Sequence, residues 1–368
     1  MSKKIHDPVY YGDYLHLNKL LDSQHPKSKE HDCEAHEETL FIIVHQVYEL
    51  WFKQILHELK SIVTMFSADT VCERDLSKVV ARLERITKIQ ALLVDQLGVM
   101  ETMTPMDFLE FRDLLVPASG FQSVQFREVE VLMGLRTHER KEVDRDYFLG
   151  RLSEEDKKRV LEIEKSDSLL ELTEAWLERI PFTKSKDFDF WKAYESEIES
   201  MLDEDEKIIQ ENHATLDSRS MAIQLENLNA TRETFASLLD EEKHNQLIKL
   251  KRRDLSRTAT MNALFILLYR EEPILHLPYK FLTTLMDIDE LFTTWRYRHA
   301  LMAQRMLGTK IGTGGSSGHE YLKKSTENNR IFPDLFDMAT FLIPKKFIPR
   351  LPNELSQKLG FTHQGTEN

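Results

Sequence analysis

The chain has 368 residues, and its 49 lysines and arginines against 62 aspartates and glutamates give a formal net charge of −13. Hydrophobic residues make up 41% of the sequence and charged residues 30%, which is typical of a globular protein that buries a full core. An acidic chain without a block of basic residues is unlike a nucleic-acid-binding protein, so we expect no nucleic-acid partner.

The sequence carries no recognisable membrane or secretory signal. The longest apolar run, residues 263–269, is far shorter than the ~18 residues that cross a bilayer. Residues 1–7 hold no apolar stretch of the kind found in secretory signals. The two cysteines, Cys33 and Cys72, are too few for a disulfide framework. We therefore expect a cytoplasmic protein without membrane contact.

Helical spacing dominates the apolar pattern, and glycine is scarce, with 12 in the whole chain. Between residues 40 and 66 two apolar stripes run side by side. The first is Leu40, Val44, Val47, Trp51 and Ile55, and the second is Phe41, His45, Tyr48 and Phe52. Two adjacent stripes predict a helix buried deep in a bundle. The sequence therefore predicts an all-α fold.

Another helix is predicted to begin at residues 104–107, which read Thr-Pro-Met-Asp. Threonine can cap a helix, proline fits the first turn, and aspartate favours the positive end of the helix dipole. This helix carries Phe108 and Arg112 on one face, and Pro117 ends it. A guanidinium beside an aromatic ring can grip a carboxylate through two hydrogen bonds. A surface salt bridge is the alternative role for Arg112.

Three other polar residues have ordinary interpretations from the residues alone. Ser119 follows a break at Pro117 and is consistent with a turn. Tyr11 and Tyr14 precede the first long helix, where surface packing is the default.

Composition changes in the middle third of the chain, where charged residues multiply and apolar positions thin out. We expect one helical domain over residues 1–368, with a core from about 1–135 and 251–355 and a charged helical insertion at about 136–250. Residues 217–250 are polar with sparse apolar positions, which predicts an exposed helical hairpin. The proline-rich stretch 331–352 is expected to run over the surface.

Two histidines lie on apolar stripes of predicted helices. His45 stands between Phe41 and Tyr48, and His299 belongs to the stripe Leu291, Trp295, His299, Met302 and Met306. A hydrogen-bonded core histidine is one interpretation of each. A neutral imidazole facing an apolar slot is also typical of an axial haem ligand, and a second imidazole opposite it could meet dioxygen. The pattern alone leaves both interpretations open.

A glycine-rich segment follows the His299 helix, since five glycines fall between residues 308 and 318. It lacks the Gly-Lys-Ser/Thr of a phosphate loop, and no strand precedes it, so nucleotide binding is not indicated. The segment concentrates backbone N–H groups and hydroxyls. This favours an ordered loop over a small polar ligand rather than a plain surface linker.

Two other metal chemistries are weighed by spacing. A di-iron bundle requires paired Glu-x-x-His motifs on separate helices, and the chain offers only Glu241 with His244. A zinc site requires a tight cluster of ligands, which His31, Cys33 and His36 approach. We regard both as weak.

Taken together, the motifs resemble those of the tryptophan 2,3-dioxygenase family, in order and spacing, from about residue 9 to residue 352. The matching segments are 11–15 (YGDYL), 40–46 (LFIIVHQ), 108–113 (FLEFRD), 117–123 (PASGFQS), 269–273 (YREEP), 295–299 (WRYRH) with the loop through Gly318, and 341–344 (FLIP). The resemblance implies an all-α bundle that encloses a pocket for haem b.

The resemblance also assigns roles to residues singled out above. His299 would be the proximal ligand of the haem iron, Ser119 would lie near the haem edge, and His45 would be the distal histidine that meets the indole N–H. Phe41 and Phe108 would wall the indole pocket; some bacterial members carry tyrosine at position 108. Arg112 would hold the substrate carboxylate, and Thr313, with a haem propionate, its ammonium. Tyr11 and Tyr14 would complete the site of a neighbouring subunit in a homotetramer.

The implied activity is insertion of both atoms of O₂ across indole C2–C3 of L-tryptophan, giving N-formyl-L-kynurenine. The cofactor would be ferrous haem b, one per subunit, and the reaction would open the kynurenine pathway of tryptophan degradation. Two alternatives remain open: a haem monooxygenase acting on a related aromatic compound, and a haem sensor or interaction protein whose acidic insertion meets a partner.

Overall fold

The computed structural model describes residues 8–135, 149–185, 188–212, 217–308 and 329–360. Over these residues the chain is mainly helical with almost no strand, which confirms the predicted all-α fold. The α-helices are α1 (Tyr11–Tyr14), α2 (Leu17–Leu20), α3 (Lys27–Glu30), α4 (His36–Phe66), α5 (Glu73–Met100), α6 (Pro105–Phe111), α7 (Val124–Met133), α9 (Glu154–Ile163), α10 (Leu169–Glu178), α11 (Phe190–Glu211), α12 (Ser218–Leu239), α13 (Glu241–Lys249), α14 (Arg257–Leu268), α15 (His276–Leu307), α17 (Pro333–Asp337) and α18 (Asn353–Leu359).

Short elements connect these helices. The 3-10 helices are η1 (Arg112–Leu115), η2 (Gly120–Gln122), η4 (Pro273–Leu275), η5 (Met338–Phe341) and η6 (Lys345–Phe347). Within the described part of the chain, strand occurs only as β1 (Lys184–Ser185) and β2 (Phe188–Asp189), which pair antiparallel.

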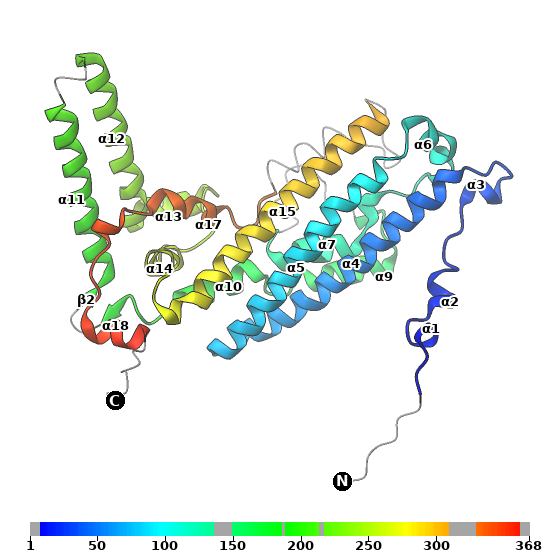
Figure 1. Cartoon of the computed structure of the whole chain (residues 1–368), viewed down its shortest axis with the longest axis horizontal. Helices are drawn as coiled ribbons and strands as arrows, with labels where there is room; N and C mark the ends of the chain where they lie inside the picture. The colour runs from blue at the N-terminus through cyan, green and yellow to red at the C-terminus, as the bar shows by residue number, and fades with distance from the viewer. Residues whose placement is uncertain (1–7, 136–148, 186–187, 213–216, 309–328, 361–368) are drawn as a thin grey trace, which may run out of the picture.

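Three long helices, α4, α5 and α15, lie side by side and form the main body of the fold (Figure 1). The helix predicted from residue 40 begins earlier, at His36, and ends at Phe66 as expected. Its inner stripe is buried at Val44, Phe52, Ile55 and Ile62, because these positions recur at helical spacing.

The carboxyl-terminal turns of α5 hydrogen-bond to both of its neighbours. On the α4 side, the Tyr48 hydroxyl donates to the Leu93 carbonyl at 2.8 Å, and the Gln96 amide donates to the Val44 carbonyl at 2.9 Å. On the α15 side, Arg298 donates to the Val94 carbonyl at 3.2 Å and pairs with Glu101 at 3.0 Å. One end of α5 therefore joins α4 and α15 at the level of residues 44–48 and 298.

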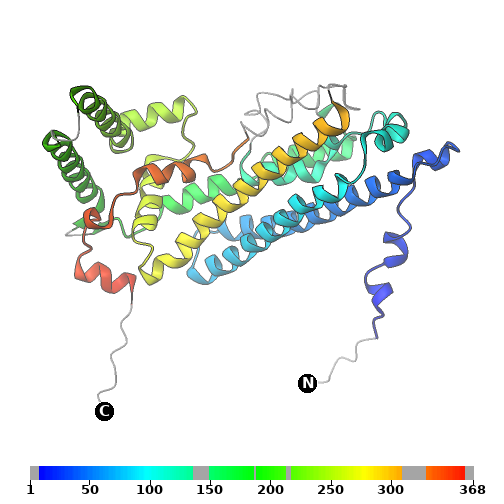
Figure 2. The same ribbon diagram turned by 45° about the horizontal axis from the view of Figure 1, so that its top comes forward.

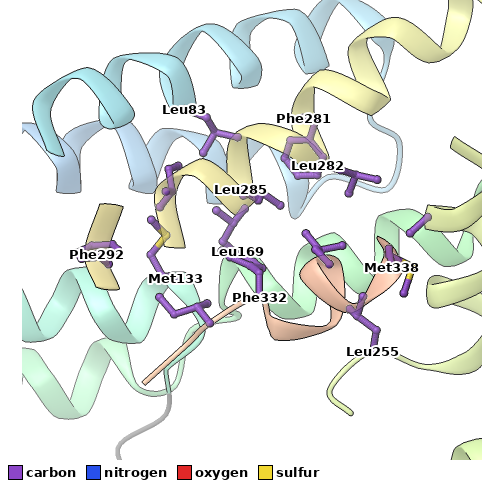
Figure 3. Close-up of a cluster of buried hydrophobic side chains, with 14 of the residues drawn as sticks. Leu83, Met133, Leu169, Leu255, Phe281, Leu282, Leu285, Phe292, Phe332 and Met338 are labelled. Carbon is purple, nitrogen blue, oxygen red and sulfur yellow. The ribbon is translucent and has the colours of Figure 1, made fainter. Parts of the chain in front are cut away.

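A continuous hydrophobic core lies beneath the three long helices. Figure 3 shows Phe281 and Leu285 of α15, Leu83 of α5 and Leu169 of α10 around Phe332. All of these side chains are buried, and so are Leu335, Met338 and Phe341 farther along the chain. The expectation that residues 331–352 run over the surface is therefore wrong for residues 331–341. Their apolar side chains fill the core because α17 and η5 fold beneath α15.

The charged middle stretch divides into two kinds of structure. α10 packs on α14 and α4 within the core, with the Asn262 amide donating to the Leu177 carbonyl at 2.7 Å. α11 begins in the core, where Phe190 and Tyr194 are fully buried. Farther along, α11 pairs with α12 and the two helices stand away from the bundle (Figures 1 and 2).

The predicted hairpin at residues 217–250 differs from the observed one. Residues 218–249 are helical as expected, but α12 packs mainly against α11, and α13 turns back toward α14. His244, expected in an exposed region, is fully buried, and its Nε2 lies 3.0 Å from the Leu255 carbonyl oxygen. Glu241, its partner in the weak di-iron motif, is exposed.

The amino-terminal arm, residues 8–34, extends beyond the end of α4 (Figure 1). The Glu38 carboxylate accepts hydrogen bonds from the backbone N–H groups of Lys27 and Ser28, both at 2.8 Å, and so fixes α3. Tyr11 and Tyr14, which precede α3 on the arm, are 75% and 73% exposed. Among the helices that the structure describes, none combines the length and the apolar character needed to cross a membrane.

Candidate functional site

His45 lies on α4 with its ring 4.2 Å from that of Phe41, centroid to centroid. Its Nδ1 is 2.7 Å from the Phe41 carbonyl oxygen. Because a carbonyl only accepts, Nδ1 carries the proton, and the neutral ring keeps a lone pair on Nε2. Burial lowers the pKa of His45, which favours this neutral form. The side chain is nonetheless exposed in the isolated chain, so protein surrounds the imidazole without sealing it from solvent.

An aromatic wall stands next to His45. Phe41 stacks on Phe108 of α6 at 5.6 Å and meets Phe111 edge-on at the same distance. Phe108 and Phe111 pack edge to face at 5.4 Å. Phe111 is fully buried, whereas Phe41 and Phe108 are half-buried. Phe41 and Phe108 are therefore the accessible rings of the wall, and Phe111 is its buried member.

The start of α6 fixes the position of Phe108 and Arg112. The Thr104 hydroxyl accepts from the Asp107 N–H at 3.3 Å, and the Asp107 carboxylate accepts from the Thr104 N–H at 2.8 Å. This reciprocal pair confirms the predicted helix start. Arg112 follows at the end of α6, with 15% of its side chain exposed, and the highly exposed Asp113 carboxylate lies 3.8 Å away. A long, solvated ion pair of this kind is weak, and a guanidinium has the donor geometry that matches a carboxylate.

His299 comes from α15, on the other side of α5. Its ring stacks on that of Trp295, one turn earlier, at 5.2 Å and 6°. Burial, with a smaller contribution from the charge of His45, lowers the pKa of His299 to about 4. The electrostatic interaction shows that the two imidazoles lie near one another although 254 residues separate them in sequence. At neutral pH His299 is therefore an uncharged nitrogen donor, which is the form that binds haem iron.

These residues fit a haem with a single protein ligand. The donor set is one neutral imidazole on α15 and, near it, a second imidazole on α4 whose Nδ1 is hydrogen-bonded to the Phe41 carbonyl. Within the described ranges, no group of three or more His, Cys, Asp or Glu side chains could hold a metal ion directly. The weak zinc alternative at His31, Cys33 and His36 therefore finds no support.

The other predicted site residues lie at different distances from this arrangement. Ser119 is half-buried between η1 and η2, and its N–H donates to the Gln122 side-chain oxygen at 3.0 Å. Tyr11 and Tyr14 belong to α1 on the amino-terminal arm, which extends beyond the end of α4 (Figure 1), and both are exposed. Thr313 lies outside the described residues.

The sequence interpretation gave no site role to three residues that lie against the site residues. Phe111 completes the aromatic wall, and Trp295 stacks on His299. Glu49, one turn after His45 on α4, accepts from the Ser123 hydroxyl at 2.6 Å and from the Gln125 amide at 2.7 Å. Trp295 and Glu49 stand four residues from a histidine and Phe111 three residues from Phe108, so helical spacing was the signal that could have found them.

Comparison with known proteins identifies relatives over nearly the whole chain. Residues 2–342 match the family model described as tryptophan 2,3-dioxygenase. The tryptophan 2,3-dioxygenase of Alteromonas mediterranea is 49% identical over 98% of this chain and 99% of its own length. That of Bdellovibrio bacteriovorus is 48% identical over 96% and 98%, and that of Dictyostelium discoideum is 45% identical over 96% and 88%.

Proposed function

The chain belongs to the tryptophan 2,3-dioxygenase family, and we propose that the site formed by α4, α6 and α15 performs the reaction of that family. The enzyme inserts both atoms of O₂ across indole C2–C3 of L-tryptophan and gives N-formyl-L-kynurenine, the first step of tryptophan degradation by the kynurenine pathway. The observation that supports this site best is the pair of neutral imidazoles, His45 and His299, beside the wall of Phe41 and Phe108.

The cofactor of the proposal is ferrous haem b, one per subunit; His299 would bind its iron and Ser119 would lie near the haem. His299 suits this role because burial keeps its imidazole uncharged at neutral pH. When bound, the haem supplies the iron at which dioxygen is activated.

The remaining residues bind and orient the amino acid. Nε2 of His45 accepts the hydrogen bond of the indole N–H, because Nδ1 carries the ring proton and donates it in a hydrogen bond to the Phe41 carbonyl. Phe41 and Phe108 pack on the indole ring, and Arg112 holds the carboxylate through two hydrogen bonds. Thr313, with a haem propionate, would hold the ammonium. Fixing both ends of the substrate aligns C2 and C3 for reaction and lowers the entropic part of the barrier.

Assembly is the second part of the proposal. We propose a homotetramer in which Tyr11 and Tyr14 complete the site of a neighbouring subunit. Both rings are about three-quarters exposed on an arm that extends away from its own bundle. Large aromatic side chains on such an arm are typical of contacts with another chain.

We propose a cytoplasmic location for the enzyme. Cys33 and Cys72 are both free and exposed, which suits a reducing compartment.

The decisive experiment is mass spectrometry of the product formed from L-tryptophan by the reduced, haem-loaded protein under ¹⁸O₂. Two labelled oxygen atoms in one product molecule would establish the dioxygenase. A single labelled atom would favour the monooxygenase. Haem binding without product and without a tryptophan-dependent spectral change would favour the sensor and refute the proposal.

A further inference from the structure

A buried ion pair joins α7 to the helix that carries His299. Arg296 donates to the Glu130 carboxylate at 2.8 Å, and both side chains are at least 96% buried. Arg127 reaches the same carboxylate at 3.2 Å. Removing charges from water in this way is costly, so the pair is maintained only where its geometry is closely satisfied. The position of this ion pair therefore shows where the contact between α7 and α15 is held closely.

The ion pair lies beside the aromatic stack that supports His299. One turn before Glu130, Phe126 of α7 packs against Trp295 at 5.1 Å, and Trp295 in turn stacks on the His299 ring. Adjacent residues of α15, Trp295 and Arg296, thus contact residues one turn apart on α7. These two contacts fix the position of α15 along its axis and its rotation about that axis relative to α7. A shift along the axis or a rotation about it would break the ion pair.

The same face of α15 also holds the segment that follows residue 328. Arg296 donates its second hydrogen bond to the Asn329 carbonyl at 2.7 Å. Two turns earlier, the buried Asp289 carboxylate accepts from the N–H groups of Ile331 and Phe332 at 3.0 to 3.1 Å. Arg296 is therefore shared between α7 and residues 329–332.

We propose that Arg296, held by Glu130, is a positioning residue for His299. The pair sets the register of α15, the register places Trp295, and Trp295 fixes the plane of the imidazole that binds the haem iron. This inference rests on the proposed function, because it assigns His299 to the iron. Neither Arg296 nor Glu130 touches substrate or cofactor in this scheme; their effect passes through Trp295.

The chain contains a matched control in Glu58. This carboxylate is also buried and also lies between two arginines, with Arg85 at 2.8 Å and Arg82 at 3.7 Å, and it joins α4 to α5. It stands thirteen residues from His45, which is about 20 Å along the helix. Glu130→Gln and Glu58→Gln therefore make the same chemical change, one near the histidines and one far from them.

The test compares haem dissociation into a scavenging apoprotein, the visible spectrum of the reduced protein, and thermal stability. Both variants should melt below the wild type. Only Glu130→Gln should release haem faster, by about 10- to 100-fold, as is found when a residue that orients a metal ligand is lost. Its spectrum should also change, and Arg296→Lys, which retains the charge, should give an intermediate rate.

Equal haem dissociation from Glu130→Gln, Glu58→Gln and wild type would overturn the inference and leave the pair with a role in stability alone. If Glu130→Gln fails to fold, Arg296→Lys decides: a wild-type rate of haem release refutes the positioning role, and a faster rate supports it. Failure of the proposed function would be seen separately, as absence of labelled product from the wild type.

Discussion

Replacing Gly134 by alanine should destabilise the protein strongly. Gly134 ends α7 with φ at +133°, a conformation that side chains rarely adopt. A Cβ at this position would lie 2.6 Å from the Leu170 Cβ and 3.4 Å from Ile331 Cγ2. The backbone strain costs about 1–3 kcal/mol and the forced movement of α10 about 1–3 kcal/mol, so we expect a loss of about 2–6 kcal/mol.

Equilibrium denaturation in urea measures this loss, and Gly98→Ala provides the opposite control. Gly98 lies within α5, where an added Cβ meets no atom within 4 Å. Alanine is the better helix former, so Gly98→Ala should stabilise the protein by about 0.5–1 kcal/mol. Equal stability of Gly134→Ala and wild type would show that the end of α7 does not approach α10 as closely as described.

Further outcomes follow from the site and from the start of α6. Arg112→Ala should retain haem and raise KM for tryptophan about 10- to 100-fold, because the lost hydrogen bonds to a charged group are worth ~1.5–3 kcal/mol. An unchanged KM would remove Arg112 from the site. His45→Ala should retain haem and lower kcat, whereas His299→Ala should lose haem, as absorbance titration would show. Thr104→Ala removes the cap of α6 and should cost about 1 kcal/mol of stability, measured by the urea midpoint. The haem-free protein should lose stability as pH falls from 6.5 to about 4, because burial depresses the pKa of His299 and the unfolded chain takes up the proton first. The free energy of unfolding should fall by about 3 kcal/mol over this range from His299 alone. An equally steep loss of stability in His299→Phe would contradict this assignment.

The sequence predicted the elements better than their contacts. The two stripes from residue 40 located α4, and the residues at 104–107 located the start of α6, because periodicity and capping are local properties. The hairpin expected at residues 217–250 is present as the contact of α12 with α13, but the packing of α12 on α11 was not predicted, because it joins helices that charge density does not pair. Residues 331–341 were misplaced because proline content masked their apolar side chains.

In the site, too, the individual residues could be predicted and their contacts could not. His45 and His299 could be selected as polar residues on apolar stripes, and Phe108 as a neighbour of Arg112. That the two imidazoles approach one another depends on the packing of helices far apart in sequence, which no local pattern specifies. The ion pair of Glu130 and Arg296 was likewise invisible, because it joins residues 166 positions apart.

The hydrogen bonds at the end of α5 have a consequence for how the site can vary. α4 carries one imidazole and α15 the other, and the last turns of α5 join both helices through Leu93, Val94, Gln96 and Glu101. The separation of the two histidines is thus set by a helix that supplies none of the proposed site residues. Substitutions on α5 could widen or narrow the reaction space while every proposed site residue stays the same, so two relatives with identical sites need not accept the same ring size.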